Sequence, residues 1–247
     1  MADAPAPASL SLKRVLPVAA LVVTGVAVVA VGWGEYLSLA ALKEHRAALT
    51  AWHEARPLAS AAAFMVVYAL AVMLSVPGSV WFTVIGGFLF GLVQGTLLTV
   101  IAATFGACAI FLAARYAFAD YFRAKAGPTL ARMERGFREN ALSYLLFLRL
   151  IPIFPFWLVN LVPALLGVPL GTYFIGTLIG ILPGSFLYTL VGYGIGAVID
   201  AGDEPDLGIL FQPAVLGSLI GLAVLSLIPV LVKRRRRAAG MDAEENG

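Results

Sequence analysis

Charged residues are scarce in this sequence and absent from most of its length. Only 13% of the 247 residues are charged and 61% are hydrophobic, whereas a soluble domain carries about 25% charged residues. No charged residue occurs among the 58 residues between Arg56 and Arg115, or among the 50 residues from Leu150 to Ile199. These long apolar runs exclude an ordinary soluble domain and predict an α-helical protein that crosses a membrane several times.

Cysteine and histidine are also scarce. Cys108 is the only cysteine, so no disulfide and no cysteine-based metal cluster can form within one chain. His45 and His53 lie in a segment of mixed charge and have no second pair of ligands nearby. The charge-free stretches hold no acid, no histidine and no nucleophile–base pair at plausible spacing. The sequence therefore predicts no metal site, no cofactor and no enzymatic activity.

The basic residues are distributed in a way that indicates orientation in a membrane. They are not interleaved with aromatic residues, so nothing indicates a nucleic-acid partner. Of the 17 Lys and Arg residues, seven lie in 115–149, five follow residue 232 and none lies in 200–206. Because basic residues favour the cytoplasmic side, we expect a multi-pass protein of the cell inner (plasma) membrane with both termini in the cytoplasm.

The alternation of polar and apolar segments divides the chain. The first apolar run is long enough to span about 30 Å of hydrocarbon, and it is long for the signal peptide that is the competing interpretation. The next segment has apolar residues at helical spacing and reads as a helix lying in the interface. We expect a disordered N-terminus at 1–12, a first transmembrane helix at 13–34, an interfacial amphipathic helix at 35–57, a core with two re-entrant hairpins at 58–198, an acidic external loop at 199–208, a last transmembrane helix at 209–232 and a basic cytoplasmic tail at 233–247.

Pro and Gly interrupt both charge-free stretches. Pro77-Gly78 lies in the middle of the first stretch, and the second has Pro152, Pro155 and Pro163. A helix broken at membrane depth is tolerated only where protein packs around it or water reaches it. We therefore predict re-entrant hairpins at 58–92 and 141–168, followed by full spans at 95–114 and 171–196. Three crossings in the first stretch would satisfy the same charge pattern. Residues 115–140 are predicted as a second surface-lying helix.

The two halves share a weakly similar sequence pattern. Pro77 is followed by Gly91-x-x-x-Gly95-Thr96, and Pro152 is followed by Gly167-x-x-x-Gly171-Thr172. With the expected topology the two halves run in opposite directions across the membrane, as in many secondary transporters. The predicted fold class is thus an all-α polytopic membrane protein with two inverted repeats. Each repeat is a re-entrant helical hairpin followed by a transmembrane helix, and interfacial amphipathic helices accompany them.

One motif in the second stretch resembles a known family. Arg149-Leu-Ile-Pro152-Ile-Phe-Pro155-Phe-Trp-Leu-Val-Asn160, followed by Gly167-Val-Pro169 and Leu182-Pro183-Gly184, is similar to the DedA superfamily. It most resembles the SNARE-associated Golgi protein (VTT-domain) branch of bacterial membrane proteins. In the first half, Val76-Pro77-Gly78 followed by Gly86-Gly87-x-x-Phe90-Gly91-x-x-x-Gly95 fits the same pattern. The resemblance covers roughly residues 58–198.

The resemblance implies a fold and a set of activities. It implies two opposed re-entrant hairpins at the membrane centre, and activity as a lipid scramblase, a lipid-carrier flippase or a proton-linked transporter. The sequence departs from the proton-coupled members at two places. Ser79 stands where those members carry an acid, and Phe154 and Pro155 stand where they carry a second arginine. We therefore do not expect proton coupling by carboxylates within the core.

Arg149 is the strongest candidate for a substrate contact. It has apolar neighbours in sequence, and no acidic residue lies within nine positions of it. An arginine at mid-membrane costs at least about 2.5–3.5 kcal/mol, and its forked donors match a phosphate group. The hypothesis is that Arg149 meets the phosphate of a lipid or another anionic substrate. The alternative is that its side chain extends to the cytoplasmic interface.

Other residues accompany Arg149 in the predicted site. Half-helix ends and freed backbone groups at the breaks could face a polar ligand, and the amide of Asn160 could cross-link the hairpin backbone or touch substrate. The predicted substrate-binding residues are Arg149, Pro152, Pro155, Asn160, Pro77 and Gly78. A second set is predicted to act as hinges or to allow close helix packing: Gly86, Gly87, Gly91, Gly95, Gly167, Gly171, Pro183 and Gly184.

These features together predict an integral membrane transport protein. It would move a lipid, as a scramblase or flippase does, or a small anionic solute across the membrane. A non-transporting factor for membrane homeostasis or assembly is the first alternative, and a proton-coupled transporter is the second. The expected partners are membrane lipids and an anionic substrate. A homo-oligomer is compatible with the sequence, which carries no pattern that sets an oligomeric state.

Overall fold

The described part of the chain consists of helices joined by short turns and loops. The computed structural model describes residues 12–30, 32, 39–76, 78–125, 137, 140–151, 154 and 156–200, with residues 213, 220, 224, 227 and 228. No strand occurs among these residues, so the predicted all-α class is confirmed. The helices are α1 (Leu12–Ala30), α3 (Leu39–Ala55), α4 (Pro57–Met73), α5 (Val80–Phe90), α6 (Leu92–Lys125), α8 (Ala141–Leu150), α9 (Phe156–Leu165) and α10 (Leu170–Asp200).

Several predicted segments lie outside the described residues. They include the N-terminus at 1–11, nearly all of the acidic loop at 199–208, most of the last transmembrane helix at 209–232 and the basic tail at 233–247. Three of the prolines at the predicted breaks, Pro77, Pro152 and Pro155, also lie outside them. The predictions for these residues stay predictions.

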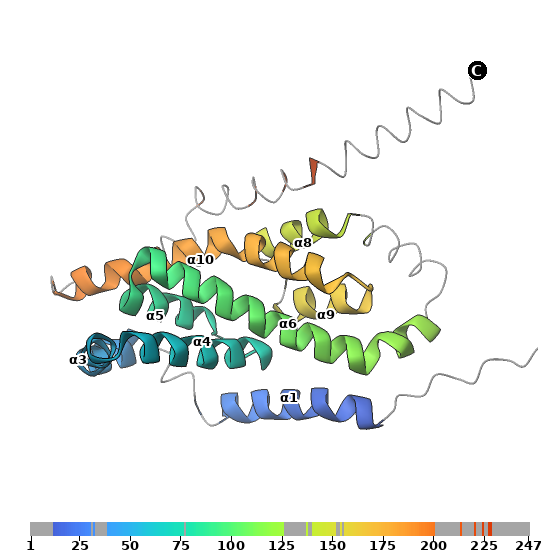
Figure 1. Ribbon diagram of the computed structural model, residues 1–247, viewed down its shortest axis with the longest axis horizontal. Helices are drawn as coiled ribbons and strands as arrows, with labels where there is room; N and C mark the ends of the chain where they lie inside the picture. The colour runs from blue at the N-terminus through green and yellow to red at the C-terminus, as the bar shows by residue number, and fades with distance from the viewer. Residues whose placement is uncertain are drawn as a thin grey trace, which may run out of the picture.

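Helices α6 and α10 form the centre of the structure and run antiparallel. Thr96 near the start of α6 bonds Thr189 near the end of α10, with 2.7 Å between the hydroxyl oxygens. At the other end, Arg115 of α6 donates from Nη1 to the carbonyl of Val168, just before α10 begins, over 3.2 Å. Figure 1 shows the two helices crossing at the middle of the molecule. Their segments Leu92–Phe118 and Leu170–Gly194 are long and apolar enough to cross a membrane.

Three of the helices that pack on this pair are too short to cross a membrane in the usual way. Helix α5 has 11 residues, and α8 and α9 have 10 each. At 1.5 Å per residue they are each roughly 15 Å long, which is about half of the hydrocarbon thickness. Breaks at 74–79 and 151–155 separate α4 from α5 and α8 from α9. These lengths favour re-entrant hairpins over three full crossings in the first stretch.

The short helices pack on the central pair in a similar way in both halves. The first helix of each hairpin packs on the long helix of its own half, so α4 contacts α6 and α8 contacts α10. The second helix crosses to the other half, so α5 contacts α10 and α9 contacts α6. Figure 1 shows α5 and α9 at opposite ends of the α6–α10 pair. This pairing is what inverted repeats would produce, and the symmetry itself stays a prediction.

Glycines allow the helices to approach closely, as required for packing without large side chains. A Cβ on Gly87 would collide with the backbone of Thr189, and a Cβ on Gly95 would lie 2.5 Å from the carbonyl oxygen of Gly86. Gly86 itself lies against Phe64 and Thr99. The remaining predicted positions lie at helix ends or in open space: Gly91 and Gly167 have positive φ of 74° and 69°, and nothing lies within 4 Å of a Cβ on Gly91, Gly171 or Gly184.

Three boundaries differ from the sequence-based expectation. Helix α6 does not end at residue 114 but continues to Lys125, because no Gly or Pro occurs before Gly127-Pro128. The start of the predicted surface helix at 115–140 is therefore wrong. Helix α10 passes through Pro183 without ending, in agreement with the predicted span at 171–196. The predicted span at 13–34 corresponds to α1, which ends at Ala30.

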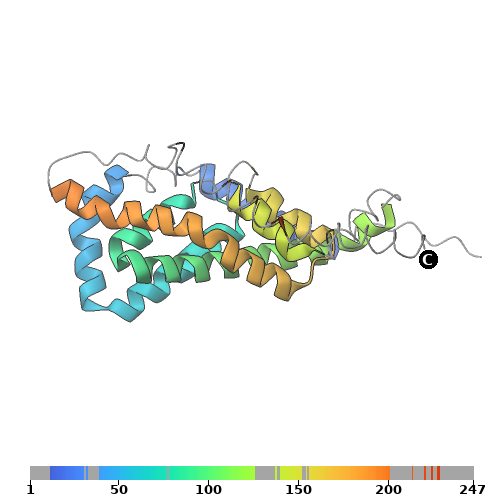
Figure 2. The ribbon, with the colours of Figure 1, turned by 90° about the horizontal axis from the view of Figure 1, so that it is seen from above.

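The predicted interfacial helix at 35–57 corresponds to α3, which meets α4 at a sharp bend. The two helices are bent by 118° at the break between Ala55 and Pro57, and Figure 2 shows α3 standing across the end of the molecule. The other helices show exposed apolar faces, which suit contact with lipid. On α10 such residues recur every three or four positions: Ile175, Ile179, Leu182, Phe186, Leu190 and Tyr193.

Candidate functional site

Arg149 lies at the centre of a polar cluster built by three helices. It occupies the last turn of α8. Its Nη2 donates to Asn160 Oδ1 of α9 at 2.9 Å, to the Tyr173 hydroxyl of α10 at 2.8 Å, and to Thr177 Oγ1 of α10 at 3.1 Å. Tyr173 and Thr177 lie four residues apart and so share one face of α10. We call these four residues the Arg149 cluster.

Two glycines on α10 create the room that the cluster needs. A Cβ on Gly180 would lie 2.7 Å from Cβ of Arg149, and a Cβ on Gly176 would lie 3.1 Å from Cβ of Leu145. The small-xxx-small spacing of Gly176 and Gly180 is a common device for close helix contact in membranes. It brings α8 against α10, so the arginine side chain can fold into the protein.

Asn160 holds the cluster together and keeps two donor hydrogens available. It is fully buried, and its Oδ1 accepts hydrogen bonds from Arg149 and from the Tyr173 hydroxyl at 2.8 Å. These two donors fix the orientation of the amide. Its Nδ2 has no hydrogen-bond partner among the described residues. A buried donor without a partner is costly, and an anionic oxygen is the kind of ligand that would satisfy it.

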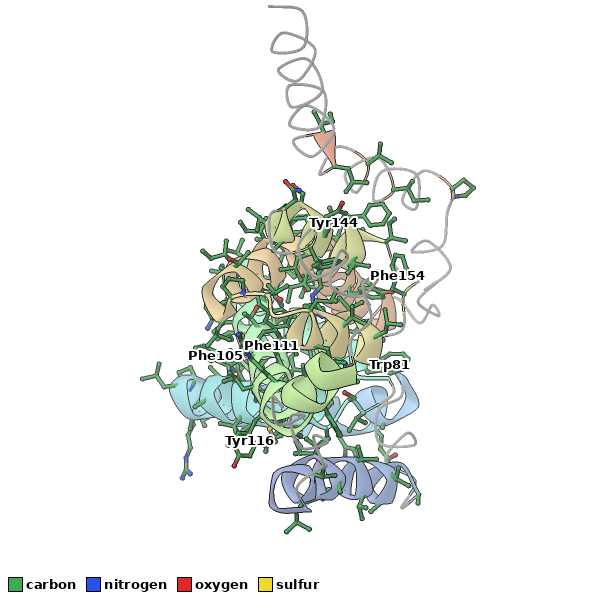
Figure 3. All side chains as sticks on the ribbon, turned by 90° about the vertical axis from the view of Figure 1, so that its right-hand side faces the viewer. Trp81, Phe105, Phe111, Tyr116, Tyr144 and Phe154 are labelled. Carbon is green, nitrogen blue, oxygen red and sulfur yellow. The ribbon has the colours of Figure 1, made fainter. Side chains whose placement is uncertain are left out.

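Tyr173 joins the cluster to α6. It is fully buried, and its ring stacks on Phe111 of α6 with 4.2 Å between the centroids. The guanidinium carbon of Arg149 lies 5.5 Å from the centroid of the same ring. The Tyr173 hydroxyl is also 3.4 Å from the carbonyl oxygen of Ala107. Figure 3 shows Phe111 in the interior of the helices, whereas Tyr116, one turn further along α6, points outward.

The position of the cluster along α10 shows that Arg149 is packed inside the protein, while its depth in a membrane stays a prediction. Tyr173 and Thr177 lie in the first two turns of a helix that begins at Leu170, roughly 5–10 Å from its end at 1.5 Å per residue. The guanidinium contacts three side chains that are fully buried. It is therefore turned into the protein, one to two turns below the end of α10, and does not extend past the helix end.

Gly78 is the one further predicted substrate-binding residue that the structure describes, and it is not brought to this cluster. Gly78 is exposed, has a positive φ of 80° and lies at the break of the first hairpin. Near that break, Tyr68 and Thr83 share a buried hydrogen bond of 2.8 Å. Pro77, Pro152 and Pro155 lie outside the described residues.

Sequence reasoning missed four residues of the site. They are Tyr173 and Thr177, which bond Arg149, and Gly176 and Gly180, which admit α8. A signal was present, because Gly176-x-x-x-Gly180 marks a packing face, Tyr173 lies three residues before Gly176, and Thr177 lies four residues after Tyr173. Across the described residues, no group of three or more His, Cys, Asp or Glu could hold a metal ion.

Comparisons with known proteins agree with this architecture. Residues 76–194 match the VTT domain. The chain is 35% identical over 175 residues to a transmembrane protein 41 homolog of Dictyostelium discoideum, which covers 70% of this chain and 51% of that protein. It is 29% identical over 177 residues to the Caenorhabditis elegans homolog, covering 70% of each protein. It is also 29% identical over 177 residues to human transmembrane protein 41B, covering 70% of this chain and 58% of that protein.

The match is thus confined to part of these relatives. The chain spans about half to 70% of the length of the relatives that it matches. No solved structure matches the chain. The matched region begins at the first break and ends within α10, so it contains the Arg149 cluster and both central helices.

Proposed function

The chain is a VTT-domain protein that fits the DedA superfamily, and we propose that it carries a lipid headgroup across the membrane with Arg149 holding the phosphate. It is an integral membrane protein, and within the described residues helices α6 and α10 are able to span a bilayer. The observation that carries the proposal is the inward-turned guanidinium of Arg149, whose three side-chain acceptors described above are all uncharged.

The chemistry of the cluster favours an anionic ligand. A guanidinium and a phosphate attract each other as opposite charges and can form two parallel hydrogen bonds, whereas Asn160, Tyr173 and Thr177 carry no negative charge, so a phosphate competes well against them. The free donors on Asn160 Nδ2 lie in the same cluster. The stretch from Leu150 to Ile199 contains no acid that would repel an anion.

The depth of the cluster favours a lipid over a soluble anion. It lies roughly 5–10 Å from the end of α10, close to the level at which lipid phosphates reside in a bilayer. A headgroup could therefore enter the cluster while its acyl chains stay beside the exposed apolar face of α10. The cluster supplies donors without a nucleophile–base pair, so the proposed activity is movement of the lipid without chemical change.

Orientation is part of the proposal. The excess of Lys and Arg in 115–149 supports a cytoplasmic location, in an inner or plasma membrane, for that segment, the end of α6 and the start of α10. Arg149 would then accept a headgroup from the cytoplasmic leaflet.

Purified protein in liposomes tests this function. Headgroup-labelled phospholipids should lose fluorescence to external dithionite faster with the protein than without it. Arg149→Ala should return the rate to the protein-free value. Arg149→Gln should do the same, although it keeps an amide donor toward the neutral partners. Arg56→Gln is the control, because Arg56 is exposed at the start of α4.

Three results would contradict the proposal. Wild-type protein that accelerates no lipid but takes up inorganic phosphate would identify a solute transporter. Wild-type protein that does neither would favour a membrane factor without transport activity. Lipid flipping by Arg149→Ala at the wild-type rate would remove Arg149 from the mechanism.

A further inference from the structure

A second arginine faces the Arg149 cluster across two stacked aromatic rings. The guanidinium carbon of Arg115 lies 5.9 Å from the centroid of Phe111. Phe111 stacks on Tyr173 at 4.2 Å, and Tyr173 lies 5.5 Å from the guanidinium carbon of Arg149. The four groups therefore form one continuous series in which a pair of rings separates two cations, and each contact is within the range of a stacking or cation–π interaction.

The two arginines lie at different depths from the same end of the helices. Arg115 bonds the carbonyl of Val168, which precedes the first residue of α10. Arg149 bonds Tyr173 and Thr177, which lie one and two turns inside α10. On α6 the order is the same, because Phe111 and Ala107 are one and two turns inside Arg115. A ligand that approaches from this end meets Arg115 before Arg149.

Most of the donors of Arg115 are available. An arginine has five N–H donors, and within the described part of the chain Arg115 makes one hydrogen bond, to Val168, and no ion pair. The bond to a backbone carbonyl fixes the side chain without neutralising its charge. Contact with the Phe111 face orients the guanidinium plane, which a lysine could not reproduce.

We propose that Arg115 is a first contact site for the phosphate of a lipid headgroup and that it selects headgroups of net negative charge. The proposal rests on the function proposed above and deepens it. A phosphate at Arg115 would next reach Arg149 along the Phe111–Tyr173 stack. A headgroup with a compensating ammonium, such as phosphocholine, would bring that cation beside two guanidinium groups. A headgroup without it, such as phosphoglycerol, would not.

Flipping rates of two labelled lipids test the selectivity. In liposomes, labelled phosphatidylglycerol should be flipped faster than labelled phosphatidylcholine by the wild-type protein. Arg115→Gln should lower the phosphatidylglycerol rate roughly tenfold, since a hydrogen bond to a charged group contributes about that factor, and should leave the phosphatidylcholine rate nearly unchanged. Arg115→Lys should restore only part of the loss. Arg56→Gln is the matched control.

A binding measurement separates failure of this inference from failure of the proposed function. In detergent, phosphatidylglycerol should raise the Tm of the wild-type protein more than phosphatidylcholine does, and Arg115→Gln should remove that difference. If no lipid is flipped but the Tm difference depends on Arg115, the proposed transport function is wrong and the proposed contact between Arg115 and the anionic headgroup is supported. Equal Tm gains in wild type and Arg115→Gln would overturn the inference, as would full recovery of selectivity by Arg115→Lys, which is what a simple interfacial anchor predicts.

Discussion

Asn160 shows how a single side chain can balance structure against function in this site. Its Oδ1 is the shared acceptor for Arg149 and Tyr173, while its Nδ2 stays without a partner in the described structure. A purely structural amide would be expected to use both ends, because buried polar groups are nearly always paired. The unused donors are thus better explained by a ligand that enters and leaves than by a fixed packing role.

Replacement of Asn160 by aspartate separates the two roles. Asn160→Asp keeps the shape of the side chain but places a carboxylate beside the Arg149 guanidinium, where it would act as a permanent internal anion. We expect a Tm equal to or above that of wild type, because the pair is charge-assisted, together with at least a roughly tenfold loss of lipid flipping. Thermal denaturation and the dithionite assay measure the two effects. Normal flipping by this variant would show that Arg149 does not need to exchange its partner.

The hydroxyl of Tyr173 is the second residue-scale test. Tyr173→Phe keeps the ring stacked on Phe111 but removes the acceptor for Arg149 and the donor to Asn160. Hydrogen bonds between membrane helices contribute about 0.6–2 kcal/mol each, so we expect a modest fall in Tm and a slower lipid flipping rate. Tyr193→Phe, at a position that is 60% exposed on the same helix, should change neither. Equal effects of the two substitutions would contradict the assigned role.

At the scale of helices, contacts across the two halves depend on glycine. Gly87 of α5 lies against the backbone of Thr189 in α10, and Gly192 of α10 lies against the carbonyl of Val84 in α5. Each of the two helices therefore contributes a glycine to the same interface. Thr189 of this interface also forms a hydrogen bond with Thr96 of α6. This interface positions α10, and through it the face that bears Tyr173 and Thr177.

Gly87→Ala is the prediction for this interface. The added methyl group would collide with backbone atoms, which cannot move aside as a flexible side chain can, and overpacking of this kind costs about 1–3 kcal/mol. The Tm should fall clearly, and flipping should fall with it. Gly184→Ala is the control, because open space surrounds that position and alanine favours helix over glycine by about 1 kcal/mol. A Tm loss at Gly184 as large as that at Gly87 would mean that helix distortion, rather than the interface, is responsible.

Much of the helical arrangement could be predicted from the sequence because its signals are local. The breaks near Pro77 and Pro152, the absence of charge and the lengths of the apolar runs place α4, α5, α8, α9 and both central helices close to where the structure has them. The end of α6 was misplaced because charge was taken as the end of a helix. Arginine and aspartate are compatible with a helix that leaves the membrane, and only Gly127-Pro128 would interrupt it.

Only part of the candidate site could be predicted, because the sequence identifies unusual residues but does not show which helices come into contact. Arg149 and Asn160 are the rare polar residues of the second stretch, so composition alone singles them out. Tyr173 and Thr177 are common residues in membrane helices, and their role depends on the tertiary contact that brings α8 against Gly176 and Gly180. Arg115 directly follows the predicted span at 95–114, and an arginine in that position reads as an interfacial anchor. Its contact with the aromatic pair is likewise visible only in three dimensions.

At the scale of the whole molecule, the antiparallel central helices fix the relation between the two hairpins. The contacts Thr96–Thr189 and Arg115–Val168 place the starts of α6 and α10 at opposite ends of the bundle. If both helices cross the membrane, the first hairpin must be connected on one face and the second on the other. This geometry is independent of which face is cytoplasmic, which the basic residues alone predict.

Cysteine labelling tests both parts of this topology in one experiment. Cys108 is the only cysteine and is buried, so Cys108→Ala gives a cysteine-free background with little change in surface. Single cysteines are then placed at Gln94, which is exposed at the start of α6, and at Gly171, which is exposed at the start of α10 and has open space around a Cβ. A membrane-impermeant maleimide should label Gln94→Cys in intact cells and Gly171→Cys only in inverted vesicles, because the segment 115–149 before α8 is predicted to be cytoplasmic.

The reverse pattern would keep the opposed hairpins but invert the orientation, and Arg149 would then receive headgroups from the outer leaflet. Labelling of both sites from one face would be incompatible with antiparallel membrane crossings of α6 and α10. It would therefore also contradict the opposed arrangement of the two hairpins.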